Sequence, residues 1–156
     1  YNVPGRTSSN LTAETTLRLA QHPKIIGSKE ASGNLEQCMK IAKEKPAGFL
    51  LISGDDLLTL AFYALGGVGV ISVLANAYPT VFKNIKQAVA AGQLGKAQKE
   101  QFKLLNINGP MYEEGNPVGV KYLLSLLNVC EPYVRLPLVL PSEKLKQKIS
   151  SLAKLD

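Results

Sequence analysis

The chain has 156 residues, of which 46% are hydrophobic and 19% are charged, and its net charge at neutral pH is +6. No apolar run approaches the roughly 18 residues that a membrane-spanning helix needs, so no transmembrane segment is predicted. The lysines are spread among alanines and glutamines rather than aromatic residues, a pattern typical of a solvated helix face and not of a nucleic-acid-binding surface.

The sequence carries no signature of export. Its opening residues, YNVPGRT, lack the basic segment followed by an apolar one that marks a secretory signal. Cys38 and Cys130 are too few and too isolated for a disulfide framework or a zinc site. We therefore expect a cytoplasmic protein whose cysteines are reduced and pack as small hydrophobic side chains, and we expect no metal and no cofactor.

Helical and strand-like patterns alternate along the first two-thirds of the chain. The first helix begins near Thr12, a residue suited to the N-cap, and has Glu14 in its first turn. The second strand is a continuous apolar run of the kind that is buried on both faces of a parallel sheet. Helices are predicted at 12–21, 34–45, 56–67 and 78–92, and strands at 24–30, 48–56 and 68–73.

The second of these helices is expected to bury one face. Leu35, Cys38, Met39 and Ala42 recur in it at helical intervals, and Pro46 ends it. The third helix ends at a pair of glycines, which suit a helix C-terminus.

From about residue 94 the pattern is one helix after another, without strands. Helices are predicted at 94–107, 116–128 and 142–154, joined by turns that contain proline. The segment VGVKYLLSLLNV is mostly apolar, so we expect it to be buried against the rest of the protein or against a partner subunit. The predicted domains are therefore an α/β domain at 1–92 and a helical domain at 93–156.

The order of elements in the first domain defines its fold class. Strand and helix alternate through three repeats with short connections, which predicts an α/β fold with parallel strands and right-handed crossovers. An α/β barrel and a doubly wound sheet are both compatible with this order. Three strands cannot close a barrel, and a (β/α)₈ barrel needs about 250 residues. Because the sequence also begins without methionine, we expect it to be the C-terminal part of a longer chain.

Polar residues follow the predicted strands at the points where these end. In an α/β barrel the reactive groups lie on that rim. A lysine there, surrounded by apolar neighbours, loses hydration, which favours the neutral amine, the form that attacks a ketone to give an imine. A tyrosine can shuttle protons around the imine, and an arginine can hold a carboxylate. Candidates for this rim are Tyr1, Asn2, Arg6, Lys29, Ser53, Gly54, Asp55, Asp56, Ser72 and Asn76.

Each of these features also has a plain structural interpretation. A lysine at a strand end is usually solvated, and YNVPGRT suits a tight bend. The segment GGVG follows a helix and precedes a strand, which indicates a helix stop rather than a phosphate-binding loop. His22 lies beside a proline at a helix end and is expected at the surface. Asp55 and Asp56 are expected to cap the helix that follows them.

Four motifs in this order and spacing resemble dihydrodipicolinate synthases. They are YNVPGRT, IIGSKEASGN, LLISGDD and GGVGVISVLAN, and the resemblance extends through NPVGVKYLL and RLPLVLP. It implies a (β/α)₈ barrel with a C-terminal helical domain, of which this chain is roughly the second half. Strand five of that barrel would end at Tyr1, and the three strands predicted above would be strands six, seven and eight.

The resemblance also implies roles for individual residues. Lys29 matches the lysine that forms a Schiff base with pyruvate, and Tyr1 matches the tyrosine that donates and accepts protons around that imine. Arg6 matches the arginine that binds the carboxylate of aspartate semialdehyde. Ile71 matches the position whose backbone carbonyl lies beside pyruvate, and Gly54 lines the same pocket.

The implied activity is a lyase-type condensation of pyruvate with L-aspartate 4-semialdehyde. Its product is 4-hydroxytetrahydrodipicolinate, on the diaminopimelate route to lysine. The implied partners are the N-terminal half of the same barrel and further copies of the protein in a homotetramer. Ser28 stands where the family usually has valine or isoleucine, and as the strand neighbour of Lys29 it should face the other way.

Two other functions stay open at this point. The lysine and tyrosine also resemble those of N-acetylneuraminate lyase and the sugar-acid aldolases, although the arginine of YNVPGRT is more typical of the synthase. A non-catalytic homologue that serves as an assembly module is the third hypothesis. Without the rest of the barrel, the chain alone is expected to be inactive and to leave sheet edges open.

Overall fold

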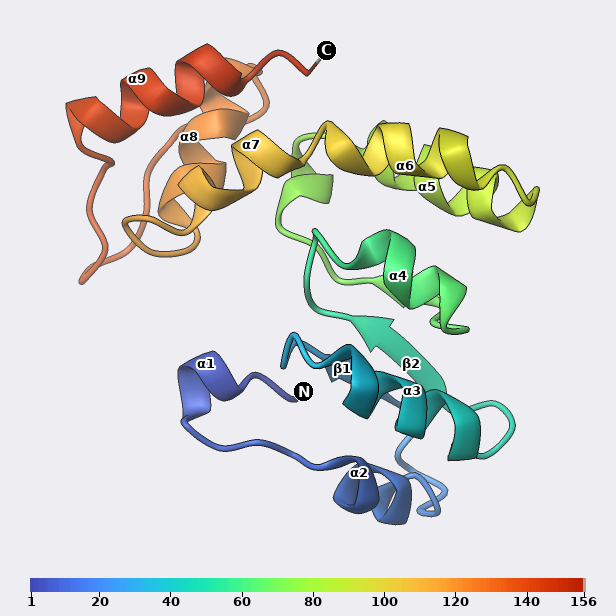
Figure 1. Cartoon of the computed structure of the whole chain (residues 1–156). Coiled ribbons are helices and arrows are strands. Elements are labelled where there is room, and N and C mark those ends of the chain that lie inside the picture. The colour runs from blue at the N-terminus through green and yellow to red at the C-terminus, as the bar shows by residue number, and fades with distance from the viewer. Residues whose placement is uncertain (156) are drawn as a thin grey trace. The chain divides into compact units, whose positions relative to one another are not determined.

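The computed structural model describes residues 1–155 and divides the chain into two compact units, Tyr1–Ser72 and a second that begins at Val73 (Figure 1). The first unit contains every strand of the described residues, and the second contains helices only. The boundary predicted between residues 92 and 93 separates the expected barrel part from the helical domain. It stays a prediction. Within the compact units, the long helix that precedes this boundary packs with the helix that follows it.

The first unit is an α/β layer built on a three-stranded parallel sheet in the order β1-β2-β3. The alternation of strand and helix predicted from the sequence is therefore confirmed, as is the parallel pairing. Gly27 allows the first two strands to approach closely, because a Cβ there would lie 2.6 Å from the Leu50 carbonyl oxygen. The elements are α1 (Pro4–Thr7), α2 (Ala13–Leu19), β1 (Gly27–Glu30), α3 (Leu35–Glu44), β2 (Leu50–Ser53), α4 (Thr59–Ala64) and β3 (Gly69–Val70).

The core of this unit lies where α3 and α4 pack on β2. Cys38 and Ile41 from α3 meet Leu51 and Phe62, and all four side chains are almost completely buried. Cys38 thus packs as the small hydrophobic residue that the sequence predicts. Burial and the nearby carboxylate of Glu30 raise the pKa of the Cys38 thiol to about 12, so this cysteine is a neutral thiol at neutral pH.

The buried face of α3 differs from the prediction at one residue. Met39 is exposed, and Gln37 takes a place on the buried side together with Cys38 and Ile41. Leu35 and Ala42 are partly buried, as expected. The buried face extends from Cys38 and Ile41 toward Gln37, whose side chain has buried hydrogen-bond partners, and Met39 lies outside it.

Of the two helix starts predicted in this unit, one is confirmed and one is wrong. Thr12 caps α2, since its side chain accepts a hydrogen bond from the Thr15 amide. The prediction that Asp55 and Asp56 cap the next helix is wrong. That helix, α4, begins only at Thr59, and the Asp55 carboxylate instead accepts the Leu57 amide in a local turn (2.9 Å).

The second unit pairs two helices, α5 and α6, through a three-residue connection at 91–93. The single helix predicted at 94–107 is wrong in extent, because α6 ends at Phe102 and α7 follows. At Leu104 the amide bonds to the carbonyl three residues back, on Gln101, which interrupts the α-helical pattern. The elements are η1 (Leu74–Asn76), α5 (Pro79–Ala90), α6 (Leu94–Phe102), α7 (Leu105–Asn108), η2 (Gly109–Met111), α8 (Val118–Leu126) and α9 (Glu143–Leu152).

Helix α8 is buried over its first two turns, where the sequence predicts burial. Val118, Val120 and Leu123 are almost fully inaccessible. Gly119 permits close contact with η2, because a Cβ there would lie 2.6 Å from the Met111 Cα atom. The last residues of the apolar segment are exposed in this chain. No helix within residues 1–155 is long and apolar enough to cross a bilayer.

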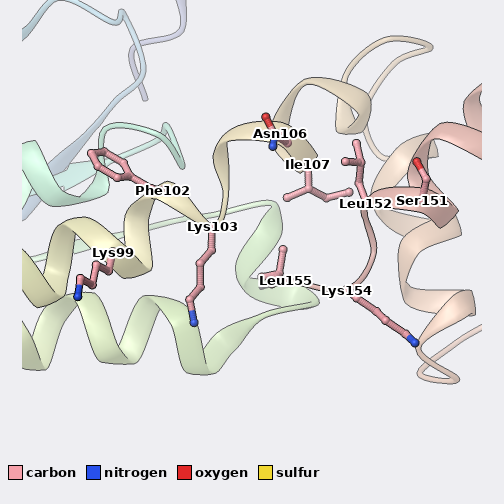
Figure 2. Close-up of a pocket in the computed structure, with 9 residues that line it drawn as sticks. All are labelled: Lys99, Phe102, Lys103, Asn106, Ile107, Ser151, Leu152, Lys154 and Leu155. Carbon is pink, nitrogen blue, oxygen red and sulfur yellow. The ribbon is translucent and has the colours of Figure 1, made fainter.

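An open cavity of about 560 Å³ lies between α6, α7 and the end of α9. Lys99, Lys103 and Lys154 line it, and Figure 2 shows their ammonium groups pointing apart rather than toward one centre. Lys103 also pairs with Glu100 at 3.3 Å. The cavity therefore lacks the converging charges that a specific anion site needs.

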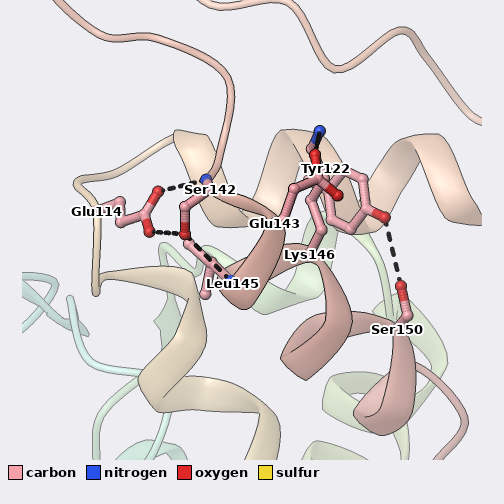
Figure 3. Close-up of polar contacts among 7 residues, drawn as sticks. All are labelled: Glu114, Tyr122, Ser142, Glu143, Leu145, Lys146 and Ser150. Carbon is pink, nitrogen blue, oxygen red and sulfur yellow. Dashed lines mark hydrogen bonds and ion pairs between the residues drawn. The ribbon is translucent and has the colours of Figure 1, made fainter.

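The start of α9 is held by Ser142 and Glu114 (Figure 3). The Ser142 hydroxyl accepts the Leu145 amide and donates to the Glu114 carboxylate, which also accepts the Ser142 amide at 2.9 Å. These hydrogen bonds lower the pKa of Glu114. Because the folded-state pKa is depressed, this stabilisation is present at neutral pH and is lost as the pH falls through the folded value.

Substitution Ser142→Ala is expected to destabilise the start of α9 by about 1 kcal/mol, the usual cost of a lost N-cap. Amide hydrogen exchange of α9 in the full-length protein should then lose about fivefold in protection. The matched control is Ser150→Ala, which removes an exposed hydroxyl contact with Tyr122 further along the same helix. Equal protection in the two variants would show that the cap does not stabilise the helix.

Candidate active site

The candidate residues lie at one edge of the parallel sheet. Lys29 is next to the last residue of β1, Gly54 follows β2 directly, and Ile71 follows β3 directly. The three strands are neighbours and run in the same direction, so these positions all lie at the edge of the sheet where the strands have their carboxyl ends. The Ile71 amide donates to the Ser53 carbonyl at 2.9 Å, which continues the pairing just past β3.

Lys29 and Tyr1 are in direct contact. The Lys29 Nζ atom lies 4.0 Å from the centroid of the Tyr1 ring, which is cation–π geometry. The lysine stem packs against Gly54, where a Cβ would lie 2.9 Å from the Lys29 Cε atom. A residue larger than glycine at position 54 would therefore displace the lysine. Lys29 is half-buried in this arrangement.

Side chains alternate along β1 as the pleat requires. Ser28 and Glu30 point to the buried face, with 8% and 1% of their surfaces exposed. Lys29 faces the opposite way, so the prediction that Ser28 does not share the face of Lys29 is confirmed.

Tyr1 is placed by its neighbour Asn2, which pairs with β1 as a parallel bridge. The Asn2 amide donates to the Lys29 carbonyl at 2.9 Å, and the Asn2 carbonyl accepts the Ala31 amide at 2.8 Å. The start of the chain thus lies beside β1 in the register of a further parallel strand. This register sets Tyr1 laterally next to Lys29.

A buried polar cluster beneath this pair was not predicted from the sequence. Glu30 is 1% exposed, and its carboxylate accepts hydrogen bonds from the side chains of Asn2 and Gln37 and from the Ser32 amide. The period of a strand predicts that Glu30 points away from Lys29, but it does not identify the partners. The only sequence signal was an acidic residue on the face that should be buried.

Arg6 is the candidate that the structure does not join to the others. It lies in α1, a four-residue helix, and is exposed. Within residues 1–155 no hydrogen bond, ion pair or ring contact joins its guanidinium to Tyr1 or Lys29. Ile71 is also largely exposed, at 53%. The structure thus brings together Tyr1, Lys29 and Gly54, with Ile71 on the same sheet edge.

Comparison with known proteins shows the family of this chain. The model of the dihydrodipicolinate synthetase family matches residues 1–155. The chain belongs to this family. A 4-hydroxy-tetrahydrodipicolinate synthase of Cytophaga hutchinsonii is 49% identical over 149 residues, which cover 96% of this chain and 50% of that protein.

Solved structures of family members have the same fold over this region. A dihydrodipicolinate synthase of Bacillus anthracis superposes with a TM-score of 0.94 at 30% identity, covering 98% of this chain and 52% of that one. The chloride-inhibited dihydrodipicolinate synthase of Acinetobacter baumannii complexed with pyruvate superposes with a TM-score of 0.91 at 30% identity. The match covers 97% of this chain and 52% of that one. The chain therefore spans about half the length of the dihydrodipicolinate synthases that it matches.

Proposed function

We propose that the full-length protein containing this chain is a Schiff-base-forming lyase that condenses pyruvate with L-aspartate 4-semialdehyde. The observation that carries the proposal is the contact between Lys29 and Tyr1 at the carboxyl edge of the sheet, in a chain of this family. A primary amine can form an imine with a 2-oxo acid, and a phenol beside it can serve as the general acid and base.

In this proposal Lys29 is the nucleophile. Its neutral amine attacks C2 of pyruvate, and loss of water from the carbinolamine gives an imine. The imine withdraws electrons from C3, so a proton leaves C3 and an enamine forms. The enamine carbon then attacks the aldehyde carbon of the second substrate. Attack of that substrate's amino group on the imine closes the ring and releases Lys29 as the free amine, so the imine serves as electron sink without a cofactor.

Tyr1 is proposed to move the protons that these steps require. The contact of its ring with the Lys29 Nζ atom, 4.0 Å from the ring centroid, supports this role. Gly54 leaves the space that the lysine stem occupies. Arg6 is proposed to bind the carboxylate of aspartate semialdehyde, and the Ile71 carbonyl to line the pyruvate pocket. Both proposals rest on their positions in the family motifs.

The chain is proposed to form the second half of a (β/α)₈ barrel, with β1, β2 and β3 as its strands six to eight, followed by a helical domain. Three strands leave two sheet edges that the N-terminal half would cover. A homotetramer in the cytoplasm, acting in diaminopimelate and lysine biosynthesis, is part of the same proposal. It is supported by the family to which the chain belongs.

A substrate panel tests the proposed reaction in the full-length protein. With pyruvate present, consumption of aspartate semialdehyde should exceed cleavage of N-acetylneuraminate or other keto-sugar acids by on the order of 10³-fold in kcat/KM, since a site built for one polar substrate rejects the others strongly. The reverse preference would indicate a sugar-acid aldolase. An imine at Lys29 without condensation of any aldehyde would indicate a non-catalytic homologue.

A further inference from the structure

We propose that Glu30 is a positioning residue, which fixes Tyr1 beside Lys29 through Asn2. The inference rests on the proposed function, because it explains how the two residues of the proposed chemistry are held together. Glu30 itself does not face the reacting centre. It lies on the opposite side of β1 from Lys29, with 1% of its surface exposed.

Among residues 1–155, the hydrogen bonds to the Glu30 carboxylate are all donated by N–H groups. The Asn2 side-chain amide lies 3.0 Å from both carboxylate oxygens, and the Gln37 amide lies 3.0 Å from one of them. The Ser32 backbone amide donates at 2.8 Å. A carboxylate is an acceptor on both oxygens, so this set of donors fits the ionised form and leaves it well satisfied. Such a buried group holds its partners firmly, because an unpaired donor there would be costly.

The cluster is closed by a second layer of hydrogen bonds. The Asn10 side chain accepts from Asn2 at 2.9 Å and donates to Gln37 at 2.9 Å. The Leu11 amide donates to the Asn2 side-chain oxygen, and the Leu11 carbonyl accepts from Gln37 at 3.1 Å. In both Asn2 and Gln37, the side-chain NH₂ group donates hydrogen bonds and the side-chain oxygen accepts one. This pattern fixes the orientation of each amide.

Asn2 connects this buried cluster to the candidate active site. Its backbone pairs with Lys29 and Ala31, while its side chain binds Glu30. The residue that precedes it is Tyr1, whose ring contacts the Lys29 ammonium. Loss of the hydrogen bonds between Glu30 and the Asn2 side chain would let the Tyr1–Asn2 segment shift along β1. The Tyr1 phenol and the Lys29 amine would both still be present. A misplacement of about 1 Å in a catalytic group can cost on the order of 10²-fold in rate.

The decisive variant is Glu30→Gln in the full-length protein. It keeps the shape but turns one acceptor oxygen into an N–H donor that faces other donors. We expect kcat to fall on the order of 10- to 100-fold. The yield of the borohydride-trapped pyruvate adduct at Lys29 should stay close to that of the unmodified protein. The rate of hydrogen–deuterium exchange at C3 of pyruvate, followed by NMR in D₂O, should fall with kcat because this step needs the tyrosine.

Two further variants separate positioning from folding. The double variant Asn2→Asp with Glu30→Gln reverses donor and acceptor between the two positions and should recover part of the exchange rate. Asn2→Ala leaves Glu30 with its other donors and should slow exchange even if Glu30→Gln does not fold. Glu36→Gln makes the same chemical change at an exposed glutamate whose partner is Lys40, and it should behave as the unmodified protein.

The outcomes distinguish this inference from the proposed function. A folded Glu30→Gln protein that exchanges and turns over at the rate of Glu36→Gln would overturn the positioning role alone. So would equal losses of adduct yield and exchange rate, since these would reflect only a smaller folded fraction. An unmodified protein that forms no adduct at Lys29 would overturn the proposed function, and the positioning role with it.

Discussion

Replacement of Lys29 by arginine is expected to lower kcat/KM of the full-length protein by on the order of 10³-fold or more, as the loss of a covalent nucleophile generally does. A guanidinium keeps the positive charge and can still lie over the Tyr1 ring, but it does not lose its proton in proteins and so cannot form the imine. The measurement is the steady-state rate of aspartate semialdehyde consumption at saturating pyruvate.

The matched control for this variant is Lys24→Arg. Lys24 is exposed and lies ahead of β1, outside the candidate active site. The control should retain the full rate, which would separate the loss of the amine from a general effect of exchanging lysine for arginine. Turnover of Lys29→Arg within a few-fold of the control would exclude Lys29 as the nucleophile.

Substitution Tyr1→Phe is expected to have the second largest effect. Phenylalanine keeps the ring against the lysine stem but removes the hydroxyl, so proton transfer should slow while substrate binding changes little. We expect kcat to fall by about 10²- to 10⁴-fold, the usual contribution of a general acid–base, with KM for pyruvate changed only a few-fold. Pre-steady-state measurement of imine formation would locate the slowed step.

Tyr133→Phe is the control for this second variant. Tyr133 is 69% exposed and belongs to the second compact unit, so loss of its hydroxyl should leave kcat unchanged. If Tyr1→Phe raised KM and left kcat intact, the tyrosine would serve in substrate binding and not in proton transfer.

Much of the first unit could be predicted from the sequence because its elements are strongly patterned. The apolar run around Leu51 identified β2, and the alternation of strands and helices identified the parallel sheet. The position of Lys29 near a strand end followed from the pattern alone. The same reasoning placed Tyr1 and Arg6 among the candidates, but their individual roles required the family motifs, because nothing in their local sequence specifies a partner.

Other features depend on contacts that a local pattern does not contain. β3 is only two residues long, with Gly69 opposite Ile52 and Val70 opposite Ser53, whereas the sequence predicts a strand over 68–73. The break between α6 and α7 depends on a hydrogen bond at Leu104, and no proline or glycine marks it. The cluster around Glu30 joins residues 28 positions apart, so it is visible only once the start of the chain pairs with β1.

The most direct test is to incubate the full-length protein with pyruvate, reduce it with borohydride and map the modified peptide by mass spectrometry. We predict a single reduced pyruvate adduct on the Nζ atom of Lys29, absent when pyruvate is omitted. An unmodified Lys29, or an adduct found only on other lysines, would contradict the account.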